Sequence, residues 1–254
     1  PGLIESNTAS TGLGLLCFLR AGYTPHEGPY QEVVSKAIYF LINRMKLTAD
    51  GGDLRDVSVV SNPIDNILLV RKSGDMYSHA IASLALCEAY AMTLDAQLKG
   101  PAQEAVNFIA YAQNEGGGWR YEPKEPGDLS VTGWQLMALK SGVLGRLEVP
   151  RHVWYRASEF IDSVQDEKGA TYGYQEPSNR RPSMTAVGLY GRLMIGWPRR
   201  HPPLLKGALL LASQHPRDSN MYFNYYTSQV LHHLGGNAWK KWNPRMRNYL
   251  IATQ

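Results

Sequence analysis

The stretch Phe108-Ile109-Ala110-Tyr111-Ala112-Gln113-Asn114-Glu115-Gly116-Gly117-Gly118-Trp119 decides the fold, because it joins a helical pattern to a sharp turn. The aromatic-aliphatic pair at 108–109 and Gln113 are spaced as neighbours on one face of a helix. Three successive glycines then end the helix and let the chain reverse. Trp119 follows at once, where its ring can pack back over the turn. The stretch therefore predicts the end of one helix and the turn that leads out of it.

The same pattern returns along the chain. In its complete form a basic residue is followed four positions later by an aromatic-aliphatic pair, as in Arg156…Phe160-Ile161, and a Gln closes it. The closing positions of five copies, some of them incomplete, are Met45, Gln113, Gln165, Gln214 and Gln254. Most of the intervals between them are near the length of one helical hairpin. A unit that recurs at such a spacing indicates stacked hairpins, because no single hairpin buries its own apolar face.

A second series alternates with the first and marks the other helix of each hairpin. Its copies Gly74-Asp75-Met76, Gly127-Asp128-Leu129 and Arg180-Arg181-Pro182 lie at equal intervals along the chain, which we call the repeat register. Each copy precedes an apolar run of helical length, as a helix start does. The two series predict a single all-α domain of about five hairpins, spanning roughly 8–53, 75–121, 128–174, 182–226 and 227–254. No regular strand is predicted, and the best short candidate is Val57-Ser58-Val59-Val60.

These repeats resemble the QW motif of the squalene and hopene cyclases, and more widely the prenyltransferase and squalene oxidase repeat that is shared with protein prenyltransferase β subunits. The resemblance extends from about Thr11 to Gln254 and is clearest at Gln113 to Trp119. It implies a terpenoid cyclase-like α/α toroid, in which an inner and an outer ring of helices surround a cavity. Members usually have about six hairpins. With five, we expect an incomplete ring with an uncovered apolar edge.

Composition excludes several classes of protein. The 254 residues are 44% hydrophobic and 19% charged, as in folded domains and unlike disordered chains. The net charge is +4, and no dense basic stretch predicts nucleic-acid binding. No apolar run is long enough to span a membrane. The two cysteines exclude a disulfide scaffold, and their apolar surroundings indicate buried, inert thiols. The sequence leaves the cellular compartment open.

Two enzymatic reactions are known in the family that this chain resembles, and each needs particular residues that can be looked for in the sequence. A cyclase protonates an alkene with a D-x-D-D acid motif at the start of an inner helix. The matching segment is Asp128-Leu129-Ser130-Val131, in which only the first Asp remains. A prenyltransferase needs a zinc ion held by Asp, Cys and His, and Cys17 and Cys87 lack that spacing. We therefore expect no metal and no cofactor.

The candidate functional residues lie at predicted helix starts and turns, and each has a structural alternative. Asp128 and His79 are the candidate catalytic groups; the alternatives are a helix cap for Asp128 and a hydrogen-bonded core residue for His79. His79 aligns with Thr132 and Thr185 in the repeat register. The aromatic and charged candidates for ligand binding, which are alternatively helix-capping and turn-packing residues, are Asp75, Arg120, Tyr121, Tyr172, Tyr174, Arg181, Tyr225 and Tyr226.

Three functions remain open on this basis. The first hypothesis is a non-catalytic repeat toroid that binds an apolar small molecule or a protein partner. The second is an isoprenoid-processing enzyme of the terpene cyclase type, with Asp128 or a group outside this chain as the acid. The third is a carbohydrate-active toroid enzyme, because rims of Tyr, Trp and Arg suit sugars. Fold alone does not choose among them.

Overall fold

The computed structural model describes residues 6–61, 68–72, 75–217 and 220–253. Within these ranges it contains ten α-helices and six short strands, so the expected all-α class is confirmed. Gly74, which opens one copy of the second series, and Gln254, which closes the Gln series, lie outside the described residues. The chain separates into two compact units, which are described one at a time. The first unit comprises Pro1–Asn114, Trp119–Pro126 and Trp134–Val153, and the second comprises Glu115–Gly118, Gly127–Gly133 and Trp154–Gln254.

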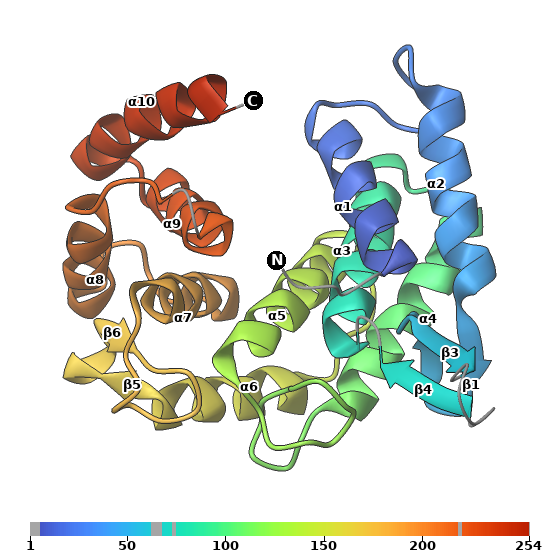
Figure 1. Cartoon of the computed structure of the whole chain (residues 1–254), viewed down its shortest axis with the longest axis horizontal. Helices are drawn as coiled ribbons and strands as arrows, with labels where there is room; N and C mark the ends of the chain where they lie inside the picture. The colour runs from blue at the N-terminus through green and yellow to red at the C-terminus, as the bar shows by residue number, and fades with distance from the viewer. Residues whose placement is uncertain (1–5, 62–67, 73–74, 218–219, 254) are drawn as a thin grey trace. The chain divides into compact units, whose positions relative to one another are not determined.

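The first unit is built from two consecutive helical hairpins. Its first four helices are α1 (Asn7–Arg20), α2 (Gln31–Arg44), α3 (Asp75–Thr93) and α4 (Ala96–Ala112). Helices α1 and α3 pack against each other, α2 packs on α1, and α4 packs on α3 (Figure 1). Most of α5 (Leu129–Leu144) also belongs to this unit. Each hairpin thus consists of two consecutive helices that pack against each other.

The second unit repeats this two-layer arrangement. It contains most of α6 (Arg151–Ser163) and all of α7 (Pro182–Ile195), α8 (Pro202–Ala212), α9 (Met221–Leu234) and α10 (Gly236–Thr253). Helix α7 lies beside α9, and α8 lies beside α10, with α7–α8 and α9–α10 joining the layers (Figure 1). The expected hairpin boundary at 226–227 was wrong, because it falls inside α9. That helix begins earlier, where the Asn220 side chain accepts a hydrogen bond from the Phe223 N–H.

The expectation of no regular strand was also wrong. Three two-stranded antiparallel ribbons are present: β1 (Lys46–Thr48) with β2 (Gly51–Asp53), β3 (Val57–Ser61) with β4 (Leu68–Lys72), and β5 (Gln165–Asp166) with β6 (Thr171–Tyr172). The strand candidate at 57–60 is confirmed within β3. Two of the ribbons follow α2 and α6 directly. There the chain reverses within a short segment, and pairing its own backbone groups satisfies them at low cost.

Equivalent hydrogen bonds recur in the repeat register. The Met76 N–H donates to the Tyr121 carbonyl at 3.0 Å, and the Leu129 N–H donates to the Tyr174 carbonyl at 2.9 Å. Each bond joins the start of one helix to the turn that follows the next helix of the series. The donors at 76 and 129 and the acceptors at 121 and 174 are each one interval of the predicted register apart.

The stretch that opened the sequence argument forms a helix end and a tight turn. Gln113 follows α4, and its Nε2 donates to the Val153 carbonyl at 2.9 Å. Trp119 is 1% exposed, and its Nε1 donates to the Ile109 carbonyl in α4 at 2.8 Å. Gly117 has a φ of +87°, and a Cβ at this residue would overlap the carbonyl of Arg156, so only glycine fits. The Trp119 ring therefore packs back over the turn, as predicted.

Replacing Trp119 with Ala should lower the free energy of unfolding by about 3–5 kcal/mol, because it empties a buried site and leaves the Ile109 carbonyl without its donor. Thermal or denaturant unfolding followed by circular dichroism measures the change. Tyr39→Ala is the control, since Tyr39 is also in the first unit and is 68% exposed. Equal small effects of the two substitutions would contradict a packing role for Trp119.

Candidate functional site

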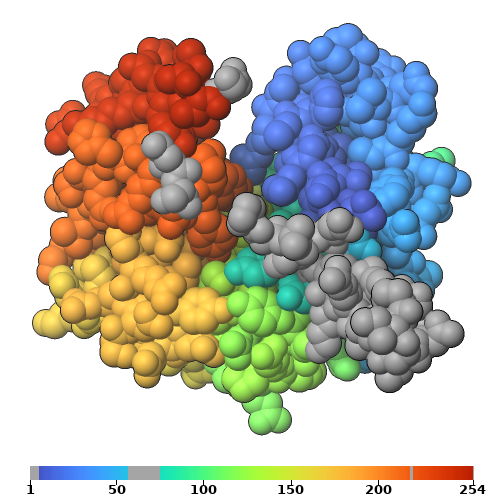
Figure 2. Space-filling view, viewed as in Figure 1, coloured from blue at the N-terminus to red at the C-terminus, as the bar shows by residue number. Residues whose placement is uncertain are grey.

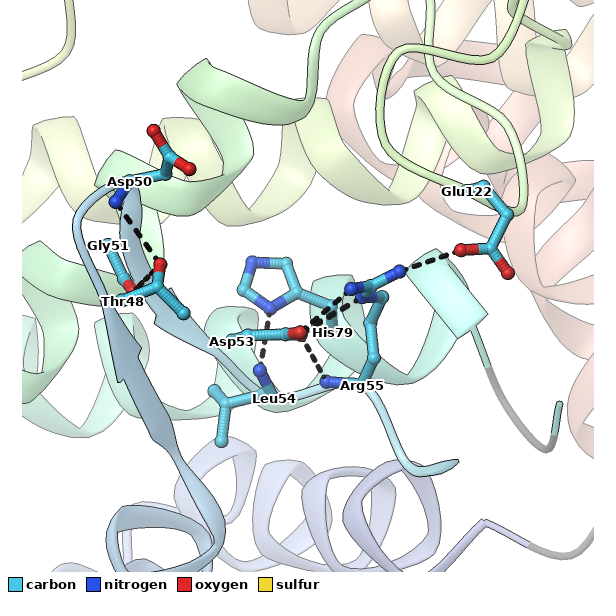
Figure 3. Close-up of polar contacts among 8 residues, drawn as sticks. All are labelled: Thr48, Asp50, Gly51, Asp53, Leu54, Arg55, His79 and Glu122. Carbon is cyan, nitrogen blue, oxygen red and sulfur yellow. Dashed lines mark hydrogen bonds and ion pairs between the residues drawn. The ribbon is translucent and has the colours of Figure 1, made fainter. Parts of the chain in front are cut away.

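His79 is buried in the first unit and uses both ring nitrogens in hydrogen bonds (Figure 3). Its Nδ1 accepts from the Leu54 N–H at 3.1 Å, which assigns the ring proton to Nε2. Nε2 lies 3.2 Å from the Ala105 carbonyl and 3.3 Å from Ser83 Oγ. Burial lowers the pKa of His79 to about 4, although the nearby Asp53 carboxylate acts in the opposite direction. The imidazole is therefore neutral at neutral pH.

The second unit contains a hydrogen bond equivalent to that of His79. Thr185 occupies the aligned position in α7, and its Oγ1 accepts from the Tyr172 N–H at 3.2 Å. In both units, a side chain near the start of a helix accepts from the N–H of a buried residue in a β-ribbon turn. This shared contact supports the structural alternative for His79.

An ion network lies at the end of β2, beside His79 (Figure 3). The Arg55 guanidinium binds both carboxylate oxygens of Asp53, at 2.9–3.1 Å, and reaches Glu122 at 2.8 Å. Burial by itself lowers the pKa of Arg55, but the two carboxylates outweigh it and the pKa is raised. Glu122 belongs to the turn after α4, so the network ties that turn to β2. Sequence reasoning missed it, because the three residues carry no shared motif.

The other candidates of the first unit lie near this network. Asp75 is at the start of α3, where its Oδ1 accepts from the Tyr77 N–H at 3.2 Å, as a capping residue does. Arg120 forms an ion pair with Glu125 at 3.0 Å and lies over the Tyr121 ring. Tyr121 in turn contacts the ring of Tyr77, with ring centres 6.1 Å apart. Asp75, Arg120 and Tyr121 are thus linked through turn contacts.

Asp128 is buried at the start of α5 in the second unit, and both of its carboxylate oxygens accept hydrogen bonds. Oδ1 accepts from Ser130 Oγ at 2.6 Å and from the Val131 N–H at 2.9 Å. Oδ2 accepts from the Tyr174 hydroxyl at 2.9 Å. The structure therefore brings two predicted site residues, Asp128 and Tyr174, together. Their contacts join the helix start to the turn at Tyr174, which is the capping alternative for Asp128.

Tyr172 and Arg181 occupy different surroundings in the second unit. Tyr172 is buried, and its hydroxyl accepts from Arg192 Nε at 3.2 Å. Burial raises the pKa of Tyr172, and the Arg192 charge opposes that effect. Arg181 precedes α7 and lines an open pocket of about 320 Å³ together with Thr185 and Gln214. Tyr172 is thus a packing residue, whereas Arg181 remains accessible to a ligand.

Aromatic side chains gather between α7 and α9 around Tyr226, which is buried. Its ring centre lies 4.8 Å from that of Tyr222, 5.3 Å from Tyr225 and 6.0 Å from Tyr190. His233 adds a further ring, 5.5 Å from Tyr190. We call these five residues the aromatic cluster. The sequence analysis selected Tyr225 and Tyr226 but missed Tyr190 and His233, although Tyr222, Tyr226 and His233 follow helical spacing along one face.

A second cavity, also missed, lies in the first unit. It is a groove of about 640 Å³ lined mainly by α2, the preceding turn and the start of α4, with Tyr39, Ile42 and Leu98 among its walls. At its rim, His26 Nε2 and Asp95 Oδ2 are hydrogen-bonded, 3.2 Å apart. No repeat signal marks the groove, because its walls come from two helices, α2 and α4, and from the turns that precede them.

The cysteines and the comparisons add the last observations. Cys87 is buried, as expected, and burial raises the pKa of its thiol to about 12, whereas the expected burial of Cys17 was wrong, because Cys17 lies on an exposed face of α1. Among the described residues, no three His, Cys, Asp or Glu side chains are grouped as metal ligands, and no helix has the length and apolar character to cross a membrane.

Comparison of the chain with protein-family models and with curated proteins finds no match.

The low pKa of His79 predicts a pH-dependent stability. As the pH falls from 7 toward 5, the unfolded chain binds a proton at the ordinary histidine pKa, but the folded chain binds it only near pH 4. The free energy of unfolding should then fall by about 1 kcal/mol per pH unit through His79 alone. Urea unfolding of the wild type and of His79→Gln across this range measures the difference in slope.

The control for this experiment is His152→Gln, which removes an exposed histidine and should leave the slope as in the wild type. Parallel pH profiles for the wild type and His79→Gln would show that His79 titrates normally, and the buried, neutral state would then be wrong.

Replacing Asp128 with Ala should lower the free energy of unfolding by about 1–3 kcal/mol, because α5 loses its cap and the Tyr174 hydroxyl loses its acceptor. Asp128→Asn keeps acceptor capacity on one oxygen and should cost less. Denaturant unfolding of both variants and the wild type measures the free energy of unfolding of each, and Asp128→Asn should lie between the other two. An Asp128→Ala protein as stable as the wild type would contradict the capping role and favour a carboxylate kept for another purpose.

Proposed function

We propose that this protein is a non-catalytic member of the squalene cyclase and prenyltransferase repeat family, and that its helices form an α/α toroid that binds an apolar ligand. Support for the repeat comes from the two-layer pairing of helices in each unit and from equivalent hydrogen bonds one interval of the repeat register apart. Gln113 and Trp119 make the kind of tie between helices and turns that the motif implies. The toroid itself is part of the proposal.

The aromatic cluster is the observation on which the ligand proposal rests. Four tyrosines and a histidine gather at α7 and α9, and Tyr222 and Tyr225 remain partly exposed. Aromatic faces contribute a large apolar contact area and little flexibility, which suits a hydrocarbon ligand. The hydroxyl of Tyr222 donates to the Ser130 carbonyl at 2.9 Å, so its ring is held in place before a ligand arrives.

The two candidate catalytic groups support a binding function over chemistry. Both oxygens of Asp128 and both ring nitrogens of His79 already serve as hydrogen-bonding partners inside their own units. A general acid or base needs a proton-accepting or proton-donating atom directed at the substrate. The proposed role of these residues is therefore to position the helix starts and turns, and the proposed role of the aromatic cluster is to hold the ligand.

The test is equilibrium binding of squalene, supplied from cyclodextrin, followed by intrinsic fluorescence. Saturable binding is expected, and Tyr222→Leu with Tyr190→Leu should weaken it by about tenfold, since it removes aromatic contacts worth roughly 1 kcal/mol or more. The matched control is Tyr39→Leu with Tyr155→Leu, which replaces two exposed tyrosines and should leave the affinity unchanged.

Chromatography and mass spectrometry of the recovered squalene decide between a binding protein and an enzyme. Recovery of unchanged squalene agrees with the proposal. A cyclised product that disappears in Asp128→Asn would overturn it in favour of the terpene cyclase alternative. Absence of saturable binding, or equal losses in the test and control variants, would remove the aromatic cluster as the ligand site.

A further inference from the structure

Charge is distributed very unevenly along the chain. Residues 196–254 contain eight of the 26 Lys and Arg residues but one of the 22 Asp and Glu residues, and therefore carry a net charge of +7. Residues 1–195, with 18 basic and 21 acidic side chains, carry −3. Together the two segments give the net charge of +4, from which the difference between them cannot be seen. All of the excess positive charge thus belongs to the part of the second unit that holds α8, α9 and α10.

Most of this basic charge is exposed and uncompensated. In the part of the chain that the structure describes, no carboxylate lies within ion-pair distance of the exposed cations Arg199, Arg200, Lys240, Lys241 and Arg247. Lys206 differs, because it pairs with Glu167 at 2.6 Å. The five cations lie in the turn before α8 and along α10. Their charge is therefore available to a negatively charged partner that binds at these helices.

Helix α8 exposes leucines where a surface helix ordinarily exposes polar side chains. Leu204 and Leu211 are buried. The other three leucines of the helix, Leu205, Leu209 and Leu210, are exposed, and 65% of Leu209 is accessible to solvent. The helix is therefore apolar on both its buried and its outer faces, and Lys206 is its one charged residue. In the same unit, α6 exposes Arg156, Glu159 and Asp162 instead. A helix that is apolar all round is typical of one that buries its outer face too.

The leucines and the cations belong to neighbouring helices. Helices α8 and α10 pack side by side, and their surface is drawn in orange and red in Figure 2. At its end α10 adds Leu250 and Ile251, both exposed. We call the exposed residues of α8, α10 and the turn before α8 the basic-leucine face.

We propose that the basic-leucine face binds the surface of an anionic lipid bilayer, with the α8 leucines inserted among the lipids and the basic side chains against the headgroups. Apolar side chains inserted at the interface and cations near anionic headgroups together give stable, reversible attachment without a spanning helix. Charge complementarity selects the occupant, because the face is strongly positive and its cations lie both in the turn before α8 and along α10. This inference does not depend on the proposed ligand.

Vesicle co-sedimentation of the whole chain tests the proposal. Binding is expected to vesicles of phosphatidylcholine with about 30 mol% phosphatidylglycerol and to be at least about tenfold weaker to phosphatidylcholine alone. It should also weaken as the salt is raised from about 0.1 M to 1 M, because ions screen the charge attraction. Absence of binding to the anionic vesicles, or equal binding to both kinds, would overturn the proposal.

Paired variants separate the two contributions. Leu205→Glu with Leu209→Glu should lower binding to anionic vesicles by about tenfold or more, whereas Leu94→Glu with Leu144→Glu, an identical change at two exposed leucines of the first unit, should change it by less than about twofold. Lys240→Glu with Lys241→Glu should also lower binding and remove most of its salt dependence. Its control is Lys46→Glu with Lys99→Glu, at exposed positions of the first unit.

Circular dichroism of each variant verifies that it is folded, and the lipid and salt dependence of the wild type keeps the test decisive if a variant does not fold. Equal losses in the test and control variants would overturn the assignment to the basic-leucine face. Salt-sensitive binding to polyglutamate, with no binding to vesicles, would overturn the bilayer proposal and identify an acidic protein as the partner.

Discussion

The Leu54 N–H donates to the buried ring of His79, and a contact of the same kind recurs in the second unit. Leu54 is buried beside helix α3, so its backbone N–H has no contact with water and must be paired within the protein. In the second unit Thr185 does the same for Tyr172. These two bonds account for a polar side chain near the start of α3 and of α7, where the neighbouring buried residues are mostly apolar.

The same constraint explains why conspicuous polar residues here serve the fold. Asp128 resembles a remnant of an acid motif by its position, but it accepts three hydrogen bonds from its own helix start and from Tyr174. His79 resembles a base at a helix start, but burial keeps it neutral and occupied. A buried polar group needs hydrogen-bond partners. Where neighbouring residues of the protein provide them, the group stabilises the fold and is not free to react with a substrate. The aromatic cluster and the basic-leucine face are different, because part of each is exposed to solvent.

The two proposed binding surfaces of the second unit lie on different helices. The aromatic cluster lies between α7 and α9, and the basic-leucine face lies on α8 and α10, in the other layer of the second unit. Alternating layers give a repeat protein two chemically independent faces, since neighbouring helices in one layer share one environment. A bilayer-attached protein with an apolar binding face would meet hydrocarbon ligands where they are dissolved, which links the two proposals without making either depend on the other.

The sequence by itself determined the helical class, the repeat register and the turn at Gln113 to Trp119, because periodicity and glycine spacing are local properties that helix geometry converts directly into structure. It also contained the charge division at residue 196, which needs only counting. The β-ribbons escaped prediction, since such short strands leave too little pattern. Only the tertiary structure decided which polar side chains are occupied: the Arg55 network, the acceptors of Asp128 and the ring contacts of Tyr190 and His233 join residues from separate elements, and such pairings follow from packing in three dimensions.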